Sequence, residues 1–301
     1  MKRKVIQIAG STCLVSLPKA WITKHNVKKG AELEVQEQGN KILISTEQSQ
    51  SLPKLIIDQA RFGKFHPNYL SAAYHMGFDD VEISFSDPKE LEAIQERINA
   101  CIGYEIVNQT STVCSIKSVS EVSIDEFNQM LRKVFLLLIN MGENSMELLS
   151  KGDFARLSEV TVLENTNNKL TDFCKRVLNK KGYSEHNKLT TIYAICMYLE
   201  RVADEYRDIC KALVDKKDKI SPAVLNDFKE VNQIFADFYS YFYTSDRAKL
   251  ERIFFSAPQM RNKLLEKMSK AKPADMIVLH ASSNILNEVY EMSTATVELH
   301  I

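Results

Sequence analysis

Apolar residues recur at helical spacing through the C-terminal part of the chain. Val134, Leu137, Leu138 and Met141 recur at this spacing, which is the pattern of an amphipathic helix that packs on a core. Polar turns interrupt the pattern, and Pro222 and Pro273 lie near expected helix starts, where proline is tolerated. The pattern predicts helices over 124–150, 153–181, 186–217, 221–244, 246–271 and 273–299.

Short sequence matches indicate that these helices form an internal repeat. GDFARL (152–157) matches SDRAKL (245–250), and the segment 168–170 matches 262–264. Leu199 and Val202 correspond in the same way to Leu286 and Val289. Because the matches keep their order in each half, we expect two three-helix units in tandem.

The segment 54–120 has a mixed pattern. VEISF, YEIVNQ and TVCSIKSVS are short β-rich runs. Between them, one short helix is expected to end at Gly77, and a second helix to begin at Asp87 with Pro88 in its first turn. Polar, Ser-rich connections at 47–53 and 118–124 separate this segment from its neighbours. The sequence therefore predicts domains over 1–46, 54–120 and 124–301.

Residues 1–46 alternate short strands with one short helix. VIQI and CLVSL precede the helix KAWITKHN, which begins at Pro18 and is expected to end at a left-handed Asn26. ELEVQEQ and KILIST follow as two further strands. About 45 residues of such short strands bury too little apolar surface to be stable alone. We therefore expect this module to dimerise.

Charge is divided between the parts of the chain. The 301 residues have zero net charge, but residues 1–46 carry eight Lys or Arg against three Glu, a net charge of +5. A basic module on an acidic body is typical of a nucleic-acid-binding protein. A solvated basic face explains the same charges and stays open as an alternative.

The order of features in residues 1–46 resembles the AbrB/MazE/SpoVT swapped-hairpin DNA-binding domain. The residues that carry the likeness are Lys4-Val5, Gly10-Ser11, VSLPKAW, NVKKGAELEV and KILI. In that family two chains interleave their hairpins into one β-barrel that presents basic side chains to DNA. The resemblance implies DNA contacts from Arg3, Lys4, Ser11, Thr12, Lys19 and Lys24.

One departure from that family concerns the strength of binding. Family members often place arginines after the loop glycine and in the short helix, where this chain has 12–14 (TCL) and 22–24 (ITK). Lysine contacts predict weaker, more salt-sensitive and less sequence-specific binding than arginine contacts. A module that only dimerises is the alternative, because phosphate contacts alone do not specify sequence.

Three carboxylates follow one stripe of the third expected helix of the body. Glu200, Asp204 and Asp208 are spaced i, i+4, i+8, so their like charges repel unless cations lie near. Arg201 and Arg207 supply part of that charge, and a hard metal ion would supply more. A solvated face of an amphipathic helix is the alternative interpretation.

At this helix the body resembles PhoU, a regulator of phosphate signalling built from two three-helix repeats. The match is the LERxxD-type motif at 199–204. The resemblance implies a carboxylate-lined site for Mg, Mn, Fe or Zn, with Glu164 from the second helix, where an expected acid is replaced by Asn168. The second repeat departs further and retains Glu291 as its candidate ligand. Together the metal candidates are Glu164, Glu200, Asp204, Asp208 and Glu291.

Other patterns bear on catalysis and location. The helical body contains no Glu-x-x-His pair, and no HExxH, Walker A or nucleophile-elbow motif occurs, so we do not expect an enzyme. Six cysteines form no CxxC pair and indicate reduced thiols in a cytoplasmic protein. No stretch of about 18 apolar residues predicts a membrane span.

The combined prediction is a multidomain α+β protein. It has an N-terminal swapped-hairpin β-barrel module, a small α/β middle domain, and C-terminal tandem three-helix bundles. The two resemblances imply a cytoplasmic dimeric regulator of phosphate uptake or phosphate-responsive transcription. Its partners would be DNA, a second copy, and a phosphate ABC transporter ATPase or a sensor protein. The alternative is a signalling scaffold that binds a transporter subunit and uses the N-terminal module only to dimerise.

Overall fold

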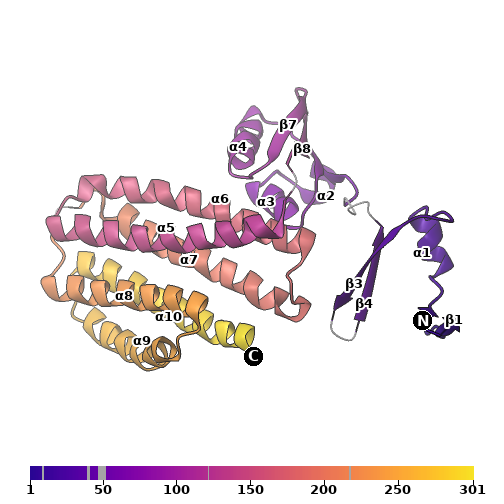
Figure 1. Cartoon of the computed structure of the whole chain (residues 1–301). Helices are drawn as coiled ribbons and strands as arrows, with labels where there is room; N and C mark the ends of the chain where they lie inside the picture. The colour runs from indigo at the N-terminus through magenta and orange to yellow at the C-terminus, as the bar shows by residue number, and fades with distance from the viewer. Residues whose placement is uncertain (9, 39–40, 47–51, 121, 217) are drawn as a thin grey trace. The chain divides into compact units, whose positions relative to one another are not determined.

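The computed structural model describes residues 1–8, 10–38, 41–46, 52–120, 122–216 and 218–301. They form two compact units, Met1–Ser51 and Leu52–Ile301 (Figure 1). The fold is mixed α+β, with a β-rich N-terminal module and a C-terminal helical body.

The N-terminal module consists of two antiparallel hairpins and one helix. Its elements are β1 (Ile6–Ile8), β2 (Thr12–Leu14), α1 (Lys19–Lys24), β3 (Leu33–Gln38) and β4 (Lys41–Thr46). Pro18 precedes the first turn of α1, and Asn26 takes a left-handed φ of 50° just beyond its end, as the sequence predicts. Within the described residues no strand pairing joins the two hairpins, so a single copy forms two separate ribbons.

The second unit begins with a small α/β layer. Its elements are β5 (Leu55–Ile57), α2 (Gln59–Phe62), α3 (Pro67–His75), β6 (Asp80–Ser84), α4 (Pro88–Asn99), β7 (Tyr104–Gln109) and β8 (Val113–Ser118). The strand order is β5-β6-β8-β7, with β5 parallel to β6 and the other pairs antiparallel. Leu70, Ile83, Ile94 and Ile116 are fully buried in its core. The sequence prediction included β6, β7 and β8 but not the three-residue strand β5.

Local capping explains where the helices of this layer begin. The Asp87 carboxylate accepts a hydrogen bond from the backbone N–H of Lys89, and the Glu90 carboxylate accepts one from the N–H of Asp87. This reciprocal capping box satisfies amide groups that the first turn of α4 would leave unpaired. Gly77 follows α3 with a φ of +87°, a conformation that glycine adopts without steric cost.

The helical body follows. Its long helices are α5 (Ile124–Lys151), α6 (Leu157–Lys181), α7 (Leu189–Leu213), α8 (Pro222–Thr244), α9 (Arg247–Met268) and α10 (Pro273–His300). Single 3₁₀ turns, η1 (Phe154–Arg156) and η2 (His186–Lys188), precede α6 and α7. A Ser123–Glu126 capping box begins α5, and Gly152 ends it with a left-handed φ of 71°.

The body packs as two groups of three helices. α5, α6 and α7 contact one another, and so do α8, α9 and α10. Across the seam between the groups, α5 packs on α8 and α7 packs on α10 (Figure 1). Val134, Leu138 and Met141 are fully buried in this core, as their stripe predicts. In the part of the chain that the structure describes, no helix is long and apolar enough to cross a membrane.

Candidate nucleic-acid interface and the charged clusters of the body

The basic side chains of the N-terminal module are exposed. Arg3 and Lys4 lie directly before β1, and Ser11 and Thr12 lie where the chain turns into β2. The Gln7 side chain donates to the Gly10 carbonyl at 3.0 Å and thereby holds this turn. The first hairpin therefore presents two cations and two hydroxyls to solvent, the groups that contact phosphates.

Lys19 and Lys24 contribute differently. They are exposed at the two ends of α1 and, being five residues apart, point about 140° apart around the helix axis. One flat surface would therefore not engage both lysines from the same copy. Among the described residues, no cation of this module has an ion-pair partner, so these charges are available to an anionic ligand.

Each hairpin also leaves an apolar face in water. Cross-strand register places Ile6 and Leu14 on one face of β1–β2, and Val35 and Ile44 on one face of β3–β4. Val35 is 62% exposed, and Ile42 on the same hairpin is 70% exposed. None of the described residues of this module is buried. Exposed apolar faces of this kind are typical of surfaces that another chain or segment covers.

The acidic stripe of α7 lies against arginine. Arg207 Nη1 is 2.9 Å from Glu164 Oε1 of α6, and its Nε donates to Asp208 Oδ1 at 2.9 Å. Arg207 also pairs with Asp204. Burial lowers the pKa of Arg207, but these carboxylates outweigh burial and raise it above its usual range. One guanidinium thus contacts three of the side chains expected to surround a metal and offsets part of their negative charge.

The remaining expected ligands are separated from that cluster. Glu200 pairs with the buried Lys175 of α6, whose Nζ is also 3.4 Å from Asp172 Oδ1. Glu291 is exposed. Nearby on α10, Glu288 faces Arg201 with 3.4 Å between Oε1 and Nη1. The five carboxylates therefore do not converge on one point.

The expected metal site stays a prediction. In the ranges described above, no group of three or more His, Cys, Asp or Glu side chains is placed to hold a metal ion. The i, i+4, i+8 spacing does place acids beside cations, and the cations in the structure are Arg207 and Lys175. Because these two side chains contact four of the expected ligands, a metal ion would have to compete with them.

Sequence reasoning missed the buried charges that join α6 to the α/β layer. Every residue from Thr171 to Leu178 is buried, which requires neighbours on all sides of the helix. Arg176, fully buried, donates from Nη1 to the carbonyls of Tyr74 (3.0 Å) and Phe78 (2.9 Å) and from Nη2 to Asp79 Oδ1 (2.6 Å). Its guanidinium also lies 4.8 Å from the Tyr74 ring centroid.

Asp172 forms a second link one turn away. His75 Nε2 of α3 lies 2.6 Å from its Oδ1, and Arg97 of α4 and Lys175 of α6 also pair with it. Burial alone raises the pKa of Asp172, but the hydrogen bond from His75 and the surrounding cations lower it to about 2. The sequence signal was present in TDFCKR (171–176), where charges interrupt an otherwise apolar helix centre.

Comparison with known proteins identifies the N-terminal module only. Residues 6–51 match the family model described as antidote-toxin recognition MazE, bacterial antitoxin. This match supports the resemblance of the two hairpins and α1 to a MazE/AbrB-type domain. The searches of curated proteins and of solved structures each found no match. For the helical body the likeness to a phosphate regulator remains a sequence prediction.

Proposed function

We propose that this chain is a DNA-binding transcription regulator whose N-terminal module is completed by a second copy. The single observation that carries the proposal is the exposed surface of that module. Both hairpins expose apolar faces, and eight cations have no ion-pair partner in the described part of the module. Domains of the matched type bind DNA and dimerise.

Dimerisation of the module explains both its exposed apolar faces and its unpaired cations. Ile6, Leu14, Val35 and Ile42 would be removed from water by the hairpins of the second copy, a gain of roughly 25 cal/mol per Å² of apolar surface. Two modules together would carry a net charge near +10 toward a DNA backbone. Because base readout favours arginine and Arg3 is the one arginine here, we expect modest sequence preference.

A finer proposal is that the body makes this regulator responsive to phosphate. Its support is the LERVAD motif at 199–204 and the packing of the helices as two groups of three. Because Arg207 already contacts three of the carboxylates on this face, we favour a sensing group other than a metal. Comparing DNA affinity with and without inorganic phosphate tests this part. Unchanged affinity would remove it without affecting the DNA-binding proposal.

The main test is fluorescence anisotropy of the full chain on a labelled DNA duplex over a salt series. We expect binding at low salt, with an affinity that falls by about 0.9 log units per log unit of salt for each phosphate contacted. No binding at the lowest salt would remove the regulator proposal. That result would favour the scaffold alternative, in which the module only dimerises.

A further inference from the structure

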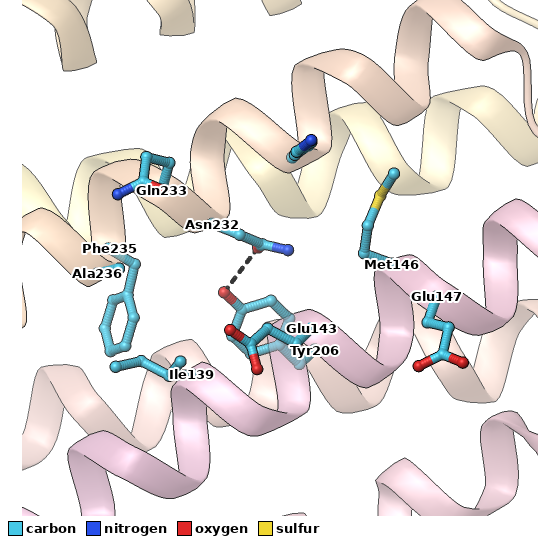
Figure 2. A pocket seen from close by; sticks show the side chains of 10 residues that line it. Ile139, Glu143, Met146, Glu147, Tyr206, Asn232, Gln233, Phe235 and Ala236 are labelled. Atoms are coloured by element: carbon cyan, nitrogen blue, oxygen red, sulfur yellow. Dashed lines mark hydrogen bonds between the residues drawn. The ribbon is translucent and has the colours of Figure 1, made fainter.

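A pocket opens along the seam where α5 meets α8 (Figure 2). Its volume is about 350 Å³, within the range of sites that hold small molecules. Ile139 and Met146 of α5 and Phe235 and Ala236 of α8 provide apolar walls. In Figure 2 the Met146 side chain extends from α5 toward α8. The pocket therefore suits a ligand with an apolar part.

A fixed polar group lies in the same pocket. The buried Tyr206 hydroxyl donates to Asn232 Oδ1 at 2.9 Å, and Asn232 Nδ2 donates to the Gly142 carbonyl at 2.9 Å. Gly142 allows this approach, because a Cβ there would lie 2.9 Å from the Tyr206 hydroxyl oxygen. The amide of Asn232 is thus held in one orientation and retains a hydrogen and a lone pair for a ligand.

Opposite charges line the same pocket. Glu143 of α5 and Lys229 of α8 both line it and are exposed. Neither makes an ion pair within the described part of the chain, whereas Glu147, which also lines the pocket, is paired with Lys151. One free carboxylate and one free ammonium at the same apolar pocket complement a ligand that carries both charges.

We propose that this pocket binds a zwitterionic small molecule with an apolar side chain, the chemistry of a free hydrophobic α-amino acid. Lys229 receives the ligand carboxylate, Glu143 receives its ammonium group, and the Asn232 amide contributes a further hydrogen bond. The apolar side chain of the ligand lies against Ile139 and Met146, which are only half-buried. This site goes beyond the proposed DNA-binding function and does not require it.

Titration calorimetry of the full chain without DNA tests the proposal. The probes are L-phenylalanine and two analogues that each lack one charge: 2-phenylethylamine without the carboxylate and 3-phenylpropionate without the ammonium group. We expect L-phenylalanine to bind, and each analogue to bind about tenfold more weakly. Equal affinity for all three probes would overturn the assignment of charges, and no heat with about 10 mM L-phenylalanine would overturn the site.

Variants assign each charge to its residue. Lys229→Met should weaken the binding of L-phenylalanine and 3-phenylpropionate but leave the binding of 2-phenylethylamine unchanged. Glu143→Gln should weaken the binding of L-phenylalanine and 2-phenylethylamine but leave the binding of 3-phenylpropionate unchanged. Ala236→Trp fills the pocket and should abolish binding of all three probes. Lys211→Met and Glu251→Gln, both at exposed positions outside the pocket, are the matched controls. Circular dichroism confirms that each variant is folded. Unchanged affinities in both pocket charge variants would overturn the proposal.

Discussion

His75 Nε2 lies 2.6 Å from Asp172 Oδ1, and this contact joins α3 of the α/β layer to α6 of the helical body. The two residues are 97 positions apart in the chain. Arg97 approaches the other oxygen of the same carboxylate. Asp172 is therefore a shared partner for two elements of the α/β layer. Its ionisation stabilises their attachment to the body.

Acid should destabilise the fold by protonating Asp172, which joins the α/β layer to the body. The pKa of Asp172 is about 2 in the folded chain, below the ordinary value of 3.8. Ionised Asp172 therefore stabilises the fold above about pH 4, and this contribution, about 2 kcal/mol, is lost as pH falls toward 2. Urea unfolding of the wild type at several pH values measures the loss. Asp172→Asn should flatten this part of the pH profile, and an unchanged slope would contradict the assignment.

Arg176 should be among the most costly side chains to remove. Arg176→Met removes one of the two donors from each of two carbonyls and leaves Asp79 with Lys180 as its remaining cation. We expect a loss of about 3 kcal/mol in the free energy of unfolding. Lys181→Met, an exposed change on the same helix, is the control and should cost under about 0.5 kcal/mol. Equal costs for the two variants would show that the Arg176 contacts contribute little.

Arg207 should replace a metal rather than accompany one. In the wild type, added Mn²⁺ should leave the melting temperature unchanged, because Arg207 already contacts Glu164, Asp204 and Asp208. Arg207→Gln removes the cation from the buried Glu164, which keeps only the hydrogen bond from Asn168, and should cost about 2 kcal/mol. Thermal melts of both proteins, with and without Mn²⁺, measure these effects. A large rise in the melting temperature of the wild type with Mn²⁺ would support the metal interpretation.

DNA binding should depend on Arg3 and Lys4 through charge. Substituting either residue with alanine should weaken binding to all duplexes alike. Each substitution should also reduce the slope of log affinity against log salt concentration. The reduction is about 1 per copy for every phosphate that the side chain no longer neutralises. Lys211→Ala, at an exposed position of α7 outside the N-terminal module, is the matched control. Salt-series anisotropy measures the slopes. Equal slopes in the wild type and both variants would show that these side chains do not bind phosphate.

The sequence predicted elements better than it predicted charge partners. The predicted helix 124–150 matches Ile124–Lys151 closely, because the Ser123 cap, the apolar stripe and Gly152 all agree. The strand Leu55–Ile57 was missed because three residues show no alternation. The acid spacing identified the helix face of Glu200 and Asp204, and the sequence also named Arg207 as a cation near it, but it did not indicate Lys175 as the partner of Glu200. Ion pairs between distant segments, such as Arg176 with Asp79, depend on tertiary packing that local patterns do not contain.

The mass of the full chain in solution tests the central claim that a second copy completes the N-terminal module. Light scattering should give twice the 34.4 kDa of one chain. Val35→Asp combined with Ile42→Asp should reduce the mass to one copy and abolish DNA binding, because charges then replace the apolar face. Leu265→Asp, an equally polar change at an exposed apolar residue of α9, should leave a dimer. A wild-type mass of one copy, or a hairpin variant that remains dimeric, would contradict the claim.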